Sequence, residues 1–177
     1  MKLHRVTTTA NILLPVLAVF AAFYVFVTAW ETVNFALLQP HWWLQDEWVD
    51  PDAQIATTTR VVYLLMWLLP IALGLFGVAA AVRLLLLVRK GVLFDARVSR
   101  GLRLVGFGVG GSGLSDMIAD LFTPLVLTWH NATETMAPRF YFDSESAGLI
   151  ICGGGFYLVG WIMSEAIKLA DENEGFI

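Results

Sequence analysis

The chain alternates between long apolar stretches and short polar connections. Four stretches predict helices over residues about 8–30, 61–88, 101–129 and 146–168. A hydrocarbon core about 30 Å thick is crossed by roughly 20 helical residues. The first, second and fourth stretches meet this length as uncharged runs over 6–30, 61–82 and 146–164, whereas the third carries Asp116 and Asp120 near its middle. The pattern therefore predicts four membrane-spanning helices.

The expected fold class is all-α, an integral membrane four-helix bundle. Lipid offers no partner for an open strand edge, so only helices fit these stretches. The first stretch is longer than the apolar part of a signal peptide and ends in the bulky Trp30, so we interpret it as a retained span. One four-span membrane domain is expected over residues 1–177.

Composition agrees with this interpretation. Hydrophobic residues make up 58 % of the chain and charged residues 15 %, whereas soluble domains have about 45–50 % apolar and about 25 % charged residues. A single cysteine excludes a disulfide framework within the chain. The net charge of −4 excludes a broadly basic protein, so we expect no nucleic-acid partner.

The basic residues predict the orientation. One side of the predicted membrane has nine of the 11 lysines and arginines, and the other side has Arg60 and Arg139. The positive-inside rule then places both termini and the central connection in the cytoplasm. The nine are Lys2, Arg5, Arg83, Arg89, Lys90, Arg97, Arg100, Arg103 and Lys168.

The connection between the second and third spans carries local signals. Gly91 is placed to end a helix in the left-handed conformation, and Asp95 to cap the next one. Phe94 precedes that cap, where a hydrophobic residue can staple onto the new helix. A basic stripe follows, which either contacts lipid phosphates or docks an acidic partner. It comprises Arg97, Arg100 and Arg103.

Two segments carry a family resemblance. One is the connection with Lys90, Gly91, Phe94, Arg103 and Gly106, and the other is the C-terminal stretch 169–177. With four spans in a short chain, they make the sequence resemble the bacterial domain-of-unknown-function family numbered 2975. The resemblance implies a small multi-pass protein of the bacterial inner membrane, and it implies no reaction.

Three polar residues lie one helical turn apart in the third span: Ser112, Asp116 and Asp120. Residues four apart share a helix face, and a carboxylate at membrane depth is a functional-site hypothesis by default. One interpretation is a proton or ion relay. The other is that the side chains hydrogen-bond to neighbouring helices and hold the bundle together. In both, the two carboxylates are expected to face protein or a polar cavity.

Arg83 and Glu165 end their apolar stretches at similar expected depth. They either form an ion pair between the second and fourth spans, or each extends separately to the inner interface.

Glycines are concentrated in the third and fourth spans. Small residues allow membrane helices to approach closely, so these glycines are expected to pack the two spans together or to form a seam for another subunit. The candidates are Gly106, Gly110, Gly153, Gly154 and Gly160.

The sequence carries no recognisable catalytic or metal-binding motif, so we expect no enzyme, no metal and no cofactor. The first function hypothesis is a non-catalytic accessory or regulatory subunit with a membrane-protein partner, or a homo-oligomer, in the lipid bilayer. The alternative is a small proton- or ion-coupled protein that uses Asp116 and Asp120. A second alternative is a cofactor- or pigment-binding subunit that uses His41 or His130 at the outer interface.

Overall fold

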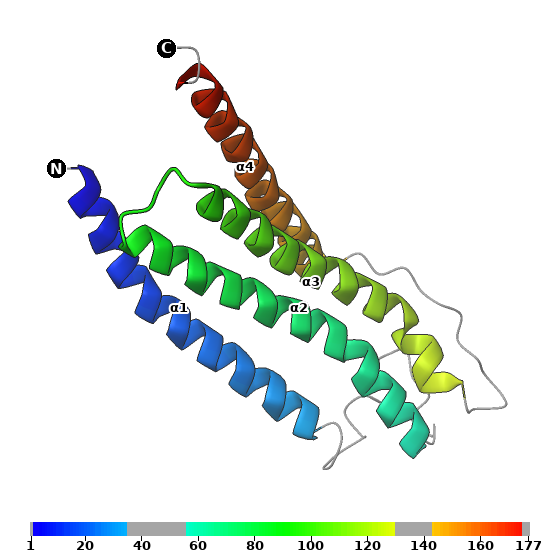
Figure 1. The fold of residues 1–177 in the computed structure, drawn as a ribbon. Helices are drawn as coiled ribbons and strands as arrows, with labels where there is room; N and C mark the ends of the chain where they lie inside the picture. Colours follow the sequence, from blue (N-terminus) through cyan, green and yellow to red (C-terminus); the bar gives the residue numbers. More distant parts are fainter. Residues whose placement is uncertain (1, 35–55, 130–142, 175–177) are drawn as a thin grey trace.

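The computed structural model describes residues 2–34, 56–129 and 143–174, and they form four α-helices without a strand in these ranges (Figure 1). The helices are α1 (Lys2–Val33), α2 (Thr57–Arg89), α3 (Ala96–Thr128) and α4 (Ser144–Glu174). The all-α prediction is confirmed. Most helix ends extend beyond the predicted spans, because charged residues such as Arg and Glu are good helix formers and do not end a helix at the edge of an apolar run.

The four helices form an open row. Within the described residues, contacts join only consecutive helices, namely α1 with α2, α2 with α3, and α3 with α4. Helix α3 is therefore covered on two sides, while α4 is held by α3 alone. The expected bundle is not closed here, since α1 and α4 make no contact in the described part of the chain.

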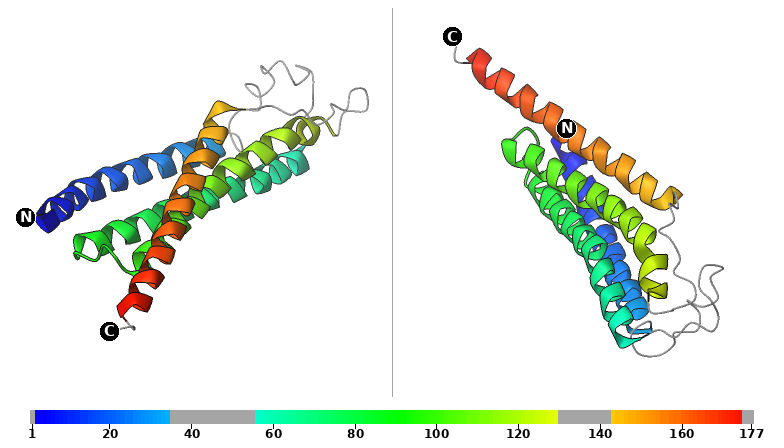
Figure 2. Two further views of the ribbon diagram at one scale, coloured as in Figure 1. Left: turned by 90° about the horizontal axis from the view of Figure 1, so that it is seen from above. Right: turned by 90° about the vertical axis from the view of Figure 1, so that its right-hand side faces the viewer.

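Successive helices run in opposite directions. The N-terminus, the C-terminus and the turn between α2 and α3 consequently lie at the same end of the molecule (Figure 1). Figure 2 shows that the C-terminal part of α4 diverges from the other three helices. We call the end with both termini the inner end and the opposite end the outer end.

Three helices are long and apolar enough to cross a membrane: α1 over Thr8–Trp30, α2 over its full length, and α4 over Ser144–Asn173. These helices indicate a membrane protein. Helix α3 is equally long, but its apolar content is diluted by glycine, serine and two aspartates. Because α2 and α4 cover two of its sides, α3 exposes less of its surface than the terminal helices of the row.

The outer end of the α2–α3 pair holds a small apolar core. Tyr63 and Leu127 are buried there, and Trp67 packs against them. The indole Nε1 of Trp129, at the end of α3, donates a 2.9 Å hydrogen bond to Thr59 Oγ1 in the first turn of α2. Elsewhere most large apolar side chains are exposed, as expected where lipid covers the surface.

Candidate functional site

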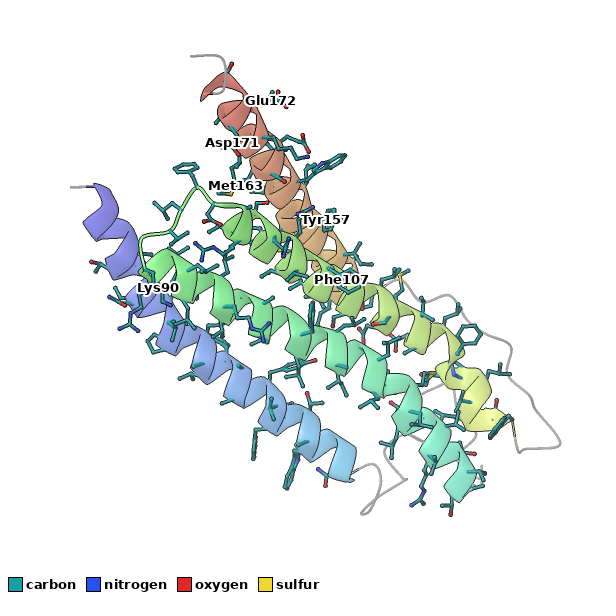
Figure 3. The ribbon with its side chains drawn as sticks, in the orientation of Figure 1. Lys90, Phe107, Tyr157, Met163, Asp171 and Glu172 are labelled. Carbon is teal, nitrogen blue, oxygen red and sulfur yellow. The ribbon has the colours of Figure 1, made fainter. Side chains whose placement is uncertain are left out.

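The face of α3 toward α4 is a glycine seam. A Cβ atom at Gly106 would lie 2.5 Å from the Gly153 carbonyl oxygen and 2.5 Å from the Tyr157 nitrogen. A Cβ at Gly113 would lie 2.6 Å from the Ser146 carbonyl oxygen. Gly110 lies against Gly153, so the two backbones touch with no side chain between them. Tyr157, on the α4 side of this seam, is labelled in Figure 3.

The seam continues to the inner end through Gly160. A Cβ there would lie 2.8 Å from the Ser99 carbonyl oxygen and 2.9 Å from Arg103 Cγ. The structure thus places Gly106, Gly110 and Gly160 in one α3–α4 contact, together with Gly153. These four glycines are covered by the neighbouring helix of the same chain, so they leave no space for another subunit.

Gly154 does not take part in the α3–α4 contact, so of its two expected uses only the seam for another subunit stays a prediction. No atom lies within 4 Å of a Cβ built at Gly154, nor at Gly148 or Gly155. A helix turns by about 100° per residue, so Gly154 points away from α3 although Gly153 touches it. The side of α4 that points away from α3 is called its outer face. It comprises the exposed residues Gly148, Ile151, Cys152, Gly155 and Val159.

A second glycine contact joins α3 to α2, and sequence analysis did not predict it. A Cβ at Gly77 would lie 3.1 Å from the Val109 nitrogen, because Gly77 and Gly108 meet backbone to backbone. A Cβ at Gly101 would lie 3.1 Å from Leu84 Cδ1. The signal was present in the glycine spacing of the third span, but nothing showed which glycines faced which neighbour.

The predicted polar row divides between two neighbours. Ser112 is buried and its hydroxyl donates a 3.1 Å hydrogen bond to the Pro70 carbonyl oxygen of α2. Asp116 turns the other way, and its Oδ2 accepts a 2.7 Å hydrogen bond from the Ser146 hydroxyl of α4. Both contacts join helices, which is the structural interpretation of the row.

Ser146 contacts two carboxylates, Asp116 and Asp143, at the outer end of the α3–α4 contact. Its side chain is fully buried, and its Oγ also lies 3.4 Å from Asp143 Oδ2. A hydroxyl has one proton to donate, and Ser146 donates it to Asp116, which is the closer of the two carboxylates. Asp120 is half-buried, and the charges of Asp116 and Asp143 act on its carboxylate.

Asp143 caps α4. Its Oδ2 accepts hydrogen bonds from the Ser146 nitrogen at 3.0 Å and from the Glu145 nitrogen at 3.1 Å. These bonds favour the charged form, so the backbone N–H groups of Ser146 and Glu145 hold the pKa of the Asp143 carboxyl below its ordinary value. The cap therefore brings a negative charge to the group around Ser146.

Tyr24 extends the polar row to α1, and sequence analysis missed it. A Cβ built at Gly74 of α2 would lie 3.0 Å from the Tyr24 hydroxyl oxygen and 3.4 Å from Ser112 Oγ. The hydroxyls of Tyr24 and Ser112 therefore both lie close to the bare backbone of Gly74. The charge of Asp116 acts on the Tyr24 hydroxyl as well. Only the spatial order of the helices reveals this placement.

The expected pair of Arg83 and Glu165 does not form. Helices α2 and α4 make no contact in the described residues, since α3 lies between them. Glu165 instead pairs with Lys168 on its own helix, at 2.8 Å. The basic group of α3 that acts on Glu165 is Arg103. The sequence matched the depths of Arg83 and Glu165, but depth alone does not make two helices neighbours.

The basic stripe is not uniform. Arg97 and Arg100 are exposed, but Arg103 is half-buried beside Gly160. Its Nε is buried and has no hydrogen-bond partner among the described residues. Positions three apart drift by about 60° around a helix that turns about 100° per residue. Arg103 has therefore rotated from the exposed side toward α4.

No group of three or more metal-ligating side chains occurs in the part of the chain that the structure describes. His41 and His130, the residues of the cofactor hypothesis, lie outside the described residues.

Comparison of the chain with protein-family models, with curated proteins and with solved structures finds no match. The resemblance to the family numbered 2975 therefore stays a prediction.

Proposed function

We propose that the chain is a four-span protein of the bacterial inner membrane, with both termini in the cytoplasm, and that it serves as a non-catalytic accessory or regulatory subunit of a membrane assembly. The positive-inside distribution of nine of the 11 basic residues supports the orientation. On this view the inner end of the molecule lies in the cytoplasm.

The observation that carries the accessory role is the one-sided attachment of α4. This helix uses Gly153 and Gly160 to contact α3, and it leaves its outer face without a neighbour in the described part of the chain. Membrane helices associate through small residues that let backbones approach. Gly148 and Gly155 offer a neighbouring helix the same access on the outer face that Gly153 gives α3.

Photo-crosslinking in native membranes tests this role. A benzophenone amino acid at Ile151, which is 76 % exposed on α4, should yield an adduct with a protein or with a second copy of the chain. Ile12 on α1, which is 62 % exposed, is the matched control and should yield lipid adducts alone. Lipid adducts alone at both positions would contradict the proposal.

A proton- or ion-coupled role is the second candidate. It is favoured by Asp116, a carboxylate inside α3 whose Oδ2 accepts a hydrogen bond from the Ser146 hydroxyl of α4. Asp116→Asn and Asp120→Asn should abolish proton flux into liposomes while leaving the fold intact. In an accessory subunit the same changes should preserve both folding and the Ile151 adduct.

A further inference from the structure

Backbone hydrogen bonds hold the first half of the turn between α2 and α3. The amide of Gly91 donates to the Val88 carbonyl oxygen at 2.9 Å, and the amide of Val92 donates to the Leu87 carbonyl oxygen at 3.2 Å. Gly91 has a φ of 79°, the left-handed conformation in which glycine alone is unstrained. The end of α2 is thus closed by backbone bonds, which define the direction in which the chain leaves it.

The second half of the turn is held by Asp95. Its Oδ1 accepts from the Arg97 backbone nitrogen at 2.7 Å and from Arg97 Nε at 3.1 Å, and its Oδ2 accepts from the second guanidinium nitrogen at 2.9 Å. The side-chain bonds to Arg97 and then the bond to its backbone lower the pKa of the Asp95 carboxyl to about 2. The charge of Arg97 is therefore compensated locally.

Three positive charges remain near this turn. Arg89 ends α2, Lys90 follows it as the C-cap, and Arg100 lies one turn into α3; all three are exposed. Neither of the ion pairs found among the described residues involves them. Lys90 is labelled in Figure 3 at the end of α2.

Phe94 protrudes from the middle of this charged turn. Its exposure of 88 % is the highest of the large apolar side chains in the described part of the chain. The staple expected between Phe94 and α3 is therefore wrong, because a stapled ring would be covered by the helix. A rigid turn that presents a bare aromatic ring among free positive charges has the chemistry of an anchor for an anionic interface.

The apolar helix surface reaches almost to the turn. Leu86 of α2 and Leu104 of α3 are both exposed, and each lies within about three turns of the helix ends that meet at the turn. In a membrane these leucines contact lipid, which brings the turn to the level of the headgroups. A charged turn at that level contacts lipid phosphates before it can contact a soluble protein.

We propose that the turn over residues 89–100 docks on anionic lipid headgroups, with Phe94 inserted between them and Arg89, Lys90 and Arg100 paired with phosphates. Anionic leaflets attract such basic segments next to a membrane span. The inference depends on the membrane placement of the proposed function, and it is independent of the accessory role. It also distinguishes the three free cations from Arg97, which Asp95 already neutralises.

Site-directed spin labelling of the full chain tests the docking. Cys152, the single cysteine, is exposed on α4 and is changed to Ser, and the label is attached through Phe94→Cys. The protein is placed in nanodiscs of phosphatidylcholine alone or of phosphatidylcholine with one quarter phosphatidylglycerol. Accessibility of the label to oxygen and to a water-soluble nickel chelate then reports its depth.

We expect the label to lie at headgroup depth with phosphatidylglycerol, with nickel accessibility several-fold lower than in phosphatidylcholine alone. Replacing Arg89, Lys90 and Arg100 together by Gln should remove this difference. The control Arg60→Gln, at the opposite end of the molecule, should preserve it. Circular dichroism of each variant verifies that the surface changes leave the helices intact.

A label in water in both lipid compositions would overturn the proposal, as would equal depth in both. A label that is exposed to water in nanodiscs but inaccessible to the nickel chelate in native membranes would also overturn it. That result would identify a protein as the partner that covers the turn. Sidedness is measured separately by labelling Phe94→Cys in intact cells with an impermeant maleimide. An external Phe94 would contradict the proposed orientation without deciding whether the turn docks on lipid.

Discussion

The two sides of α4 use the same residue type in opposite ways. On the side of α4 that faces α3, a Cβ at Gly153 would collide with Gly110 N and Cα and would lie 2.7 Å from the Gly106 carbonyl oxygen. One residue later, a Cβ at Gly154 would meet nothing within 4 Å. Glycine is therefore required at the first position and unconstrained at the second. A glycine count cannot distinguish the two, but the direction of each Cα–Cβ bond can.

The largest expected effect is at Gly153. Gly153→Leu should destabilise the protein by about 3 kcal/mol or more, since overpacking a tight contact commonly costs about 1–3 kcal/mol and a full side chain has no space here. Reversible unfolding in mixed detergent micelles measures the change in the free energy of unfolding. Gly154→Leu is the matched control and should be neutral or stabilising by up to about 1 kcal/mol, from better helix propensity. Equal losses at both positions would abolish the distinction between the two sides.

The hydrogen bond between Asp116 and Ser146 should give the next largest effect. Ser146→Ala and Asp116→Ala should each destabilise the protein by about 1 kcal/mol, because hydrogen bonds between membrane helices average about 0.6 and reach about 1.7 kcal/mol. A double-mutant cycle isolates their coupling. Additive losses would mean that the contacting side of α4 is held by its glycines alone.

Two serines of α3 extend the comparison to the α2 side. Ser112 bonds to another helix, whereas Ser115 bonds only to carbonyl oxygens of its own helix, those of Gly111 at 2.8 Å and Ser112 at 2.9 Å. Ser112→Ala should destabilise the protein by about 0.6 kcal/mol, and Ser115→Ala should have almost no effect. If the two unfolding energies agree, the bond between Ser112 and α2 contributes nothing measurable.

The smallest effect is expected at the exposed cap of α3, where no neighbouring helix contributes. The folded pKa of Asp95, about 2, lies below its ordinary 3.8. The stabilisation by the cap is therefore fully present above about pH 4 and is lost as the pH falls through about 2. Amide exchange of Arg97 should show lower protection at pH 2 than at pH 5. Asp95→Asn should remove this pH dependence. Equal protection at pH 2 and pH 5 in the chain without substitutions would contradict the role of Asp95 as the cap.

Local features of the fold could be predicted from the sequence. The apolar runs predicted the four helices, and Gly91 and Asp95 marked the turn between two of them, because a left-handed glycine and a capping carboxylate act within a few residues. Phe94 shows the limit of such rules, since a staple also needs a helix surface in the right direction.

The long-range contacts could not be predicted, because they depend on which helices are neighbours. Arg83 and Glu165 are separated by α3, whereas Ser146 reaches Asp116 because α4 crosses α3 at that level. Tyr24 of α1 lies close to Gly74 of α2, where a side chain would crowd its hydroxyl. These contacts are set by the lateral order of the helices, and one sequence does not record that order.

The consecutive order of contacts has a consequence for biogenesis. In the described chain each helix packs only on the helix made immediately before it and on the one made after it. Low sequence separation between contacting segments favours rapid folding. Each new helix leaving the ribosome finds its docking surface already synthesised, so assembly can follow synthesis step by step. Helix α4 docks last, on the glycine seam that α3 already presents.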